Sequence, residues 1–303
     1  MTATGRPRVA VMTFVHERDR DLAIDMLESL ARSSPQADLD VYLVDDASPS
    51  RTGDAVAEWC VDHGYEVHCL RHDEHTGYRG AIQRTLELLT VVAGSTEPYD
   101  FVLRIDSDAL VVRDHLIEFL QQHCTDRRGM YGVTRRMRRK DAAALLLDLL
   151  PAGLMRTEQD GVVGHDYSLR RTRPVWWWRI GLRSFAKGFR FRFADGPCVV
   201  LGSDVPRMLL QSGDLARHRP DRHGLITSEE DVIVSMICRA NGVHHTGLET
   251  FEPSWAQMNW IGAGVLDAPT DAVPFVVHPL KPTPEGLELR RRIHKTLPFF
   301  VDS

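Results

Sequence analysis

The sequence has little cysteine and no long hydrophobic run. Its 303 residues contain five cysteines, an odd number, and no two of them have the CxxC spacing. We therefore expect neither a zinc site nor a disulfide framework, which fits a reducing, cytoplasmic setting. The most apolar later stretch, Ala142 to Leu154, is interrupted by Asp148 and Pro151 and is too short to span a bilayer. The first apolar stretch runs directly into charged residues, unlike a signal peptide.

Two phosphate-binding signatures are also missing. The first apolar run continues as Thr13-Phe14-Val15-His16-Glu17, without the GxGxxG fingerprint of dinucleotide-binding folds, and no P-loop motif occurs. These absences argue against a dehydrogenase and a P-loop enzyme. The net charge of −5, from 37 basic and 42 acidic residues, lacks the basic excess of nucleic-acid-binding proteins, so we expect no nucleic-acid partner. If nucleotide phosphates bind here, a cation must neutralise them.

Apolar runs and helical spacings alternate through the first half of the chain. Buried strands are expected at residues 9–15, 39–44, 66–70 and 101–105. Each is followed by a helical pattern, at residues 19–32, 52–63, 80–93 and 113–123. This alternation predicts an α/β fold with a mostly parallel central sheet and helices on both faces. The second half is less regular, with helices expected at 141–150, 228–241 and 285–295 and strands at 197–201 and 275–277.

Paired aspartates follow the fourth expected strand. Asp106 and Asp108 flank one residue directly after the run DFVLRI. Residues i and i+2 of an extended chain point to the same side, so both carboxylates can reach one ion. Mg²⁺ and Mn²⁺ prefer such oxygen ligands together with substrate phosphates. A polar turn is the alternative explanation, but a position at the carboxyl end of a strand, where α/β sheets bind ligands, favours a metal site.

A second acidic pair, Asp45-Asp46, ends the second expected strand and should lie at the same edge of the sheet. One of these carboxylates is a candidate for binding a ribose hydroxyl or a base edge. A helix cap or a loop turn explains the pair equally well. A phosphoacceptor pair of the response-regulator type would follow the first strand rather than the second.

Four segments of the first half resemble the GT-A glycosyltransferases, especially the family 2 group. They are, in order, VAVMTFVHERD, LDVYLVDDASPS, HTGYRGAIQRTLEL and DFVLRIDSDALVV. The resemblance implies a GT-A (Rossmann-like) fold and a donor site whose residues match by position. The implied roles are nucleobase lining for Thr13 and Val15, base or ribose binding for Asp46, diphosphate contact for Arg79, ribose or metal contact for Asp106 and direct metal binding for Asp108. Many members have an aromatic residue where Val15 stands, so the identity of the base stays open.

The second half resembles the family more faintly, in DGPCVVLGSDV and SEEDVIVSMICRANGV. The resemblance implies that Asp231 is the general base of the reaction, with Glu230 as its neighbour. Such a base must deprotonate the acceptor hydroxyl, and a helix start favours an ionised carboxylate. A capping box with Ser228 as the N-cap and Asp231 three residues on is the alternative.

A late histidine and lysine lie in the string VVHPLKP. In several GT-A enzymes a histidine at this stage completes the metal site and a basic residue meets the diphosphate. The resemblance therefore implies metal binding by His278 and donor binding by Lys281. A structural or exposed histidine is the alternative for His278.

Tryptophans beside arginines mark candidate acceptor-binding segments. Trp176 and Trp177 lie in an arginine-rich stretch, and Trp255 and Trp260 lie in PSWAQMNWIG. Such side chains can stack on sugars, bind an anionic acceptor or sit at a membrane interface. Packing in the core explains them equally well. Peripheral membrane contact is left open by these patterns.

Together these features predict a metal-dependent glycosyltransferase that uses Mn²⁺ or Mg²⁺. The expected donor is a nucleotide diphosphate sugar (UDP-, GDP- or dTDP-linked), and the acceptor is a small molecule or glycan. A single base candidate favours inversion at the anomeric carbon. Residues 1–125 are expected to form the donor-binding half and residues 126–303 the acceptor-binding half of a single domain. The alternatives are a nucleotidyltransferase and a non-catalytic nucleotide- or glycan-binding protein.

Overall fold

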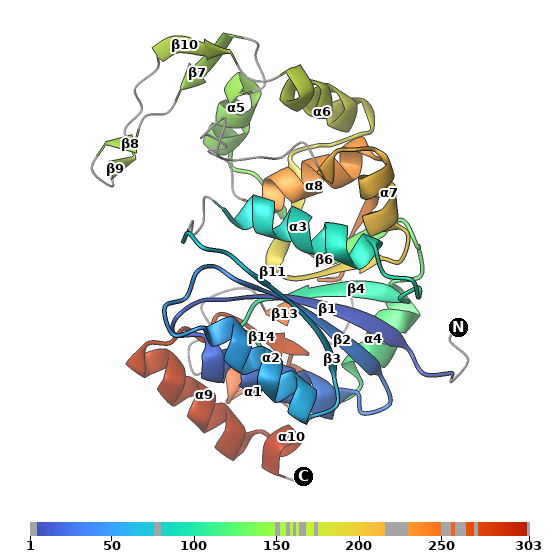
Figure 1. Cartoon of the computed structure of the whole chain (residues 1–303), viewed down its shortest axis with the longest axis vertical. Coiled ribbons are helices and arrows are strands. Elements are labelled where there is room, and N and C mark those ends of the chain that lie inside the picture. The colour runs from blue at the N-terminus through green and yellow to red at the C-terminus, as the bar shows by residue number, and fades with distance from the viewer. Residues whose placement is uncertain are drawn as a thin grey trace.

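In the computed structural model of the chain, a twisted central sheet lies between layers of helices (Figure 1). The structure describes residues 5–75, 80–148, 152–155, 158–159, 162–163, 168–172, 175–215, 230–249, 256–257, 265–269 and 272–301. Within these ranges, no helix combines the length and the apolar character needed to cross a bilayer.

The central sheet has seven strands in the order β12-β6-β11-β4-β1-β2-β3. Four parallel strands from the first half form one side, namely β1 (Arg8–Val15), β2 (Asp38–Asp45), β3 (Glu66–Arg71) and β4 (Phe101–Ile105). The other side contains β6 (Gly129–Arg136), β11 (Arg192–Gly202) and β12 (His244–Gly247). β11 is antiparallel to both β4 and β6, whereas β12 is parallel to β6. The mostly parallel sheet expected from the sequence is confirmed.

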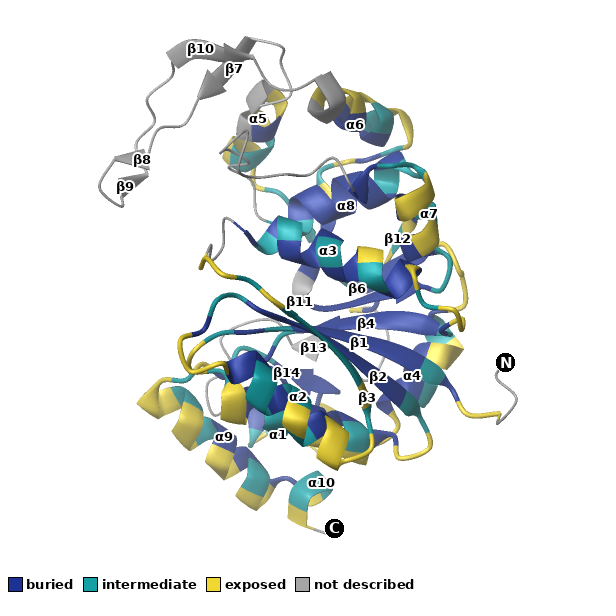
Figure 2. Ribbon diagram, in the orientation of Figure 1, coloured by how far each residue is buried: buried dark blue, intermediate teal, exposed yellow. Residues whose placement is uncertain are grey.

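Helices cover both faces of this sheet. One face packs against α3 (Ala81–Ala93), α6 (Val175–Ala186), α7 (Val205–Gln211) and α8 (Glu230–Ala240). The other packs against α1 (Arg20–Ser33), α2 (Thr52–Asp62) and α4 (Leu116–His123). Side chains of β1 alternate between the two layers, with Met12 in the first and Val11 in the second, because successive strand residues point to opposite faces. Figure 2 shows the continuous buried zone that results.

A smaller sheet brings the C-terminal segment to the carboxyl edge of the central one. It consists of β5 (Leu110–Val111), β14 (Val276–Val277) and β13 (Ala256–Gln257). β14 pairs with β5 just after the aspartate turn, so the chain beyond β14 continues beside that turn. Helices α9 (Pro284–Thr296) and α10 (Pro298–Val301) follow, and α9 packs under β5 and β14.

The remaining described elements lie at the other end of the molecule (Figure 1). They are α5 (Arg139–Asp148) and the two antiparallel pairs formed by β7 (Ala152–Met155) with β10 (Ser168–Thr172) and by β8 (Glu158–Gln159) with β9 (Val162–Val163). The arginine- and tryptophan-rich stretch thus contains a strand and the helix α6, neither of which was predicted from the sequence.

Several expected boundaries are corrected by tertiary contacts. The fourth helix, expected from residue 113, begins at Leu116 because His115 has a left-handed backbone (φ 65°) and the hydroxyls of Ser33 and Ser34 accept the first helical amides. Strand β11 is longer than the expected 197–201 because its first residues pair with the arginine-rich end of β6. Ser228, expected to cap α8, lies outside the described residues.

Candidate active site

The Asp106-Ser107-Asp108 turn follows β4 and is fixed by main-chain hydrogen bonds. The amide of Ala109 donates to the carbonyl of Asp106 at 3.0 Å, and the amide of Leu280 donates to the carbonyl of Asp108 at 2.8 Å. Arg290 of α9 donates to the Ala109 carbonyl at 2.5 Å. The C-terminal segment is therefore held directly against the turn.

His278 and Lys281 reach the aspartates from this segment. His278 Nε2 lies 3.0 Å from Asp108 Oδ1 and 3.7 Å from Asp106 Oδ2. Lys281 Nζ lies 2.9 Å from the other oxygen of Asp108. One ligand atom from each of Asp106, Asp108 and His278 lies within 4.8 Å of the other two. Two carboxylates and an imidazole at this spacing are a suitable donor set for a divalent cation.

Different neighbours give the two carboxyl groups different pKa values. Burial raises the pKa of Asp106, and the nearby Arg104 only partly opposes this effect. Burial acts on Asp108 in the same direction, but hydrogen bonds with His278 and Lys281 outweigh it and lower the pKa of Asp108 to about 2. Asp108 is thus ionised at neutral pH, the state that metal ligation requires.

Arg104 of β4 is enclosed by three carboxylates. Its Nη1 donates to Asp231 Oδ1 at 3.2 Å and its Nη2 to Glu230 Oε2 at 3.1 Å, while Nη2 lies 3.5 Å from Asp106 Oδ1. Its guanidinium also lies over the ring of Phe14, 5.3 Å from the centroid. Burial alone would lower the pKa of Arg104, but the carboxylates outweigh burial and raise it. Arg104 therefore joins the turn after β4 to the start of α8.

A small cavity lies beside this guanidinium. Its volume is about 10 Å³, and Thr85, Arg104 and Asp231 are the polar residues among its lining. Arg104 Nε is buried and has no hydrogen-bond partner among the described residues. A cavity of this size is close to the minimum for one water molecule, which would satisfy that donor.

Glu230 and Asp231 open α8 and have different partners. Glu230 accepts one short hydrogen bond from the Thr85 hydroxyl and another from Arg104, and burial raises its pKa against the opposing effect of Arg104. Asp231 accepts from Arg104 through Oδ1, and no hydrogen bond from the described residues reaches its Oδ2. Asp231 is therefore the member of the pair with an oxygen available to receive a proton.

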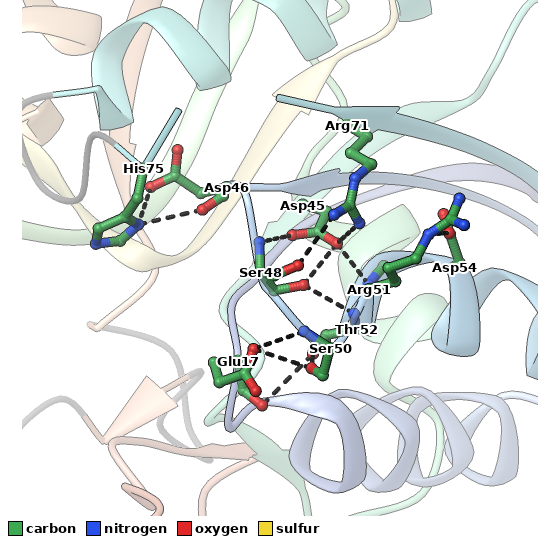
Figure 3. Close-up of polar contacts among 11 residues, drawn as sticks. Glu17, Asp45, Asp46, Ser48, Ser50, Arg51, Thr52, Asp54, Arg71 and His75 are labelled. Atoms are coloured by element: carbon green, nitrogen blue, oxygen red, sulfur yellow. Dashed lines mark hydrogen bonds and ion pairs between the residues drawn. The ribbon is translucent and has the colours of Figure 1, made fainter. Parts of the chain in front are cut away.

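The second acidic pair divides into a structural and a site-facing residue. Figure 3 shows Asp45 surrounded by the loop that follows β2. Its carboxylate accepts from the Ser48 amide at 2.7 Å, the Ser48 hydroxyl at 2.7 Å, the Gly53 amide at 3.0 Å and Arg71 at 3.1 Å. Gly53 is required here because a Cβ would lie 2.6 Å from the Cβ of Asp45. Asp45 thus closes the loop, as the turn interpretation of the pair predicted.

Asp46 points away from that loop, toward α3 and His75 (Figure 3). Arg84 Nη2 donates to Asp46 Oδ1 at 3.0 Å, and His75 Nδ1 lies 2.8 Å from Asp46 Oδ2. The ring of His75 lies against that of His16, with centroids 4.2 Å apart. Asp46, the residue expected to bind a base or ribose, is therefore partly exposed and lies beside two imidazole rings. Val15 itself has no aromatic ring that could stack on a base.

The other expected site residues are placed as follows. Thr13 and Val15 are buried on β1, at 0% and 1% exposure, and the Thr13 hydroxyl has no partner within the described part of the chain. Trp176 and Trp177 belong to α6, but their side chains are outside what the structure describes. Arg79, Trp255 and Trp260 lie outside the described residues altogether. Their expected roles stay predictions.

Arg104 was missed in the sequence analysis, although the sequence contained a signal for it. An arginine inside the apolar run DFVLRI must be paired if that run is a buried strand, because an unpaired buried charge is very costly. Two of its three carboxylate partners, Glu230 and Asp231, could not be named, since they come from α8, more than a hundred residues later in the chain. The pairing of Arg84 with Asp46 was missed because it also joins separate elements, 38 residues apart.

Comparisons with known proteins place these features in context. The family described as "Glycosyl transferase family 2" matches residues 10–192. No curated protein matches the chain. Among solved structures, the chain is similar to the galactosyltransferase LgtC in complex with donor and acceptor sugar analogs. The TM-score is 0.50 and the identity 11%, over 95% of this chain and 96% of that one.

Two further solved structures are similar with lower scores. The mannosyltransferase PcManGT from Pyrobaculum calidifontis, in complex with GDP-Man and Mn²⁺, has a TM-score of 0.47 and 16% identity over 99% of this chain. TarS residues 1–349 from S. aureus have a TM-score of 0.47 and 14% identity over 95% of this chain. This chain covers 64% and 65% of their lengths, which is less than two thirds.

Proposed function

Since the chain belongs to glycosyl transferase family 2 and has the GT-A fold, we propose that it transfers a sugar from a nucleotide diphosphate sugar to an acceptor hydroxyl. The observation that carries this proposal is the convergence of two acidic groups on one guanidinium. Arg104 Nη2 contacts both Asp106, which groups with Asp108 and His278, and Glu230, while Nη1 contacts Asp231. A leaving-group site and a base site are thus adjacent.

The residues present fit a divalent cation, Mn²⁺ or Mg²⁺. Asp106, Asp108 and His278 would hold it, and the low pKa of Asp108 keeps that ligand ionised. When bound, such an ion supplies Lewis-acid stabilisation of the charge on the departing diphosphate. Lys281, whose side chain is half exposed, can then contribute a second positive charge to the same phosphates.

Asp231 is the general base of the proposed reaction. Its free oxygen accepts the proton of the acceptor hydroxyl while that hydroxyl attacks the anomeric carbon. Arg104 holds the other oxygen and so fixes the direction of the carboxylate, and Glu230 is held beside it by Thr85. With one base and a direct displacement, the product has the inverted anomeric configuration. A product with the donor's own configuration would rule out this assignment of Asp231.

In this proposal the two halves of the chain bind different substrates. Residues 1–125 supply the base and ribose site, with Thr13, Val15, Asp46 and Arg79 as its proposed contacts. Residues 126–303 supply Asp231 and the acceptor site, with the four tryptophans named above as candidate contacts. The donor's diphosphate is shared, because His278 and Lys281 come from the second half. The acceptor is a small molecule or glycan bearing the attacked hydroxyl.

A thermal-shift screen of UDP-, GDP- and dTDP-sugars, each with and without Mn²⁺, tests the proposal. We expect one nucleotide class to raise the melting temperature only when the ion is present. The same donor should give a nucleoside diphosphate as product, whereas a nucleotidyltransferase would release pyrophosphate. The variant Asp108→Asn should lose the shift, and Asp54→Asn, a surface control, should keep it. No shift with any donor and ion would contradict the proposed function.

A further inference from the structure

A basic cluster lies where β6 ends and β11 begins. It consists of Arg136, Arg139, Lys140 and Arg192, all exposed. Arg136 and Arg192 are direct partners in the antiparallel register. Residues opposite one another in such a ladder have Cβ atoms about 5 Å apart, and like charges there are destabilising. Arg139 and Lys140 follow within four residues, in the first turn of α5.

The acidic residues near this cluster are already engaged with other groups. Asp195 pairs with Arg135, and Asp141 pairs with Arg138 at 2.8 Å. Glu249 accepts from the amide and hydroxyl of Thr134. Among the residues that the structure describes, no carboxylate forms an ion pair with the four members of the basic cluster. Within the described part of the chain, the cluster therefore carries a concentrated positive charge without an ion-pair partner, on a chain whose net charge is −5.

The cluster lies at the same edge of the sheet as the aspartate turn. β4 and β6 run in the same direction on either side of β11, so Ile105 and Arg136 both mark carboxyl ends. Two strand spacings, roughly 10 Å, separate β4 from β6 across the sheet. The register also places Arg136 about three residues beyond the level of Ile105 along the strands, so the cluster is roughly 14 Å from the end of β4. The bulged segment of β11 that includes Asp195 lies between them.

We infer that the basic cluster binds a phosphate group carried by the acceptor. Guanidinium groups bind phosphate oxygens in a bidentate manner, and two facing arginines suffice to neutralise the charge of about −2 on a phosphate ester, with two further cations beside them. The separation of roughly 14 Å from the end of β4 leaves room for the reacting sugars between that phosphate and the aspartate turn. This inference rests on the proposed function, which it deepens by naming an anionic acceptor.

Binding of inorganic phosphate to the full chain, with metal removed by EDTA, tests the inference directly. Calorimetric titration should give millimolar binding to the unmodified protein, weakened at least about tenfold in Arg136→Gln/Arg192→Gln. The control Arg207→Gln/Arg292→Gln removes two exposed arginines elsewhere and should leave the affinity unchanged. Equal phosphate affinity in the cluster variant and the unmodified protein would overturn the inference, because the phosphate would then bind at another site.

Two further arms separate the sources of the phosphate. Glycerol phosphate represents a soluble ester, and phosphatidylcholine vesicles containing phosphatidic acid represent a lipid headgroup. Loss of binding to either probe in the cluster variant supports the inference and identifies the source. If the cluster variant bound both probes as tightly as the unmodified protein does, the inference would be contradicted.

A measurement of donor binding distinguishes failure of this inference from failure of the proposed function. Metal-dependent donor capture should be the same in the cluster variant and the unmodified protein, since the cluster is two strands away from the aspartates. Normal donor capture with unaltered phosphate binding would sink the inference alone. Absence of donor capture in both proteins would sink the proposed function, while the phosphate titration would still decide the inference.

Discussion

Asp45 and Asp108 are buried carboxylates at the same edge of one sheet, but their partners differ in kind. Asp45 accepts two main-chain amides, a hydroxyl and an arginine from its own loop and the adjacent strand. Asp108 instead meets His278 and Lys281, two side chains from the opposite end of the chain. Burial alone therefore does not mark a functional acid. A carboxylate whose partners are side chains of a separate segment can exchange them for a ligand, whereas one saturated by the amides of its own loop cannot.

The largest effect is expected on the Asp108 side of this comparison. Asp108→Asn keeps the size of the side chain but removes the charge that is proposed to hold the cation, and with it the cation's contact with the diphosphate. Transfer should fall by at least about a thousandfold, or about 4 kcal/mol in transition-state stabilisation. Initial rates with the donor that the thermal-shift screen selects measure this loss. A melting temperature close to that of the unmodified protein would show that the loss is functional. Turnover within tenfold of the unmodified protein's would contradict a functional role for Asp108.

Removing Arg104 should affect both stability and catalysis. Arg104→Met leaves Glu230, Asp231 and Asp106 buried without their shared cation, which should cost about 3 kcal/mol of unfolding free energy. Urea unfolding measures this loss. Arg127→Met is the matched control, because its pair with Asp204 is on the surface and should be worth no more than about 1 kcal/mol.

Arg104→Lys separates the two contributions of that residue. It restores the charge but cannot span three carboxylates, so stability should largely recover while kcat stays at least about tenfold low with little change in donor KM. A kcat that recovers together with stability would limit Arg104 to a structural role.

Asp45 should show the reverse of Asp108. Asp45→Ala strands the amides of Ser48 and Gly53 in a buried loop, so the free energy of unfolding should fall by about 2 kcal/mol. Metal-dependent donor capture by the folded fraction should be retained. The control is Asp54→Ala, a largely solvent-facing side chain in the first turn of α2. It should change the free energy of unfolding by less than about 1 kcal/mol. If Asp45→Ala lost donor capture while its stability stayed unchanged, Asp45 would be the functional acid and this assignment would be wrong.

The smallest effect concerns His245 of β12, a partly buried base with a buried Nε2 atom. Burial, together with the charge of Arg239, lowers the pKa of His245 to about 3. The unfolded chain protonates this histidine below about pH 6.5 and the folded chain does not, so stability falls as pH drops below that value. At pH 4.5, His245→Gln should therefore lose less melting temperature, relative to pH 7.5, by about 2–4 °C. The control variant His244→Gln changes an exposed neighbour and should behave as the unmodified protein. An equal change in melting temperature in the two variants would show that the effect does not come from His245.

The regular half of the fold was predictable because its signals are local. Strands β1 to β4 and helices α1 to α3 match their expected limits within about two residues, since apolar periodicity and strand-end acids decide them. β6 was not predicted, because its second half carries exposed arginines in place of an alternating apolar pattern. The grouping of Asp106, Asp108 and His278 agrees with the family resemblance, although its metal role stays a proposal. The saturation of Asp45 and the ion pairs of Arg104 depend on contacts between separate elements that no local pattern specifies.

Electron paramagnetic resonance of Mn²⁺, titrated with protein and nucleoside diphosphate, decides whether the aspartate turn binds the cation. We expect the signal of free Mn²⁺ to be lost on adding the unmodified protein or Asp45→Asn, and to persist with Asp108→Asn. Equal capture of Mn²⁺ by Asp108→Asn and by the unmodified protein would contradict the claim that Asp106, Asp108 and His278 form the cation site.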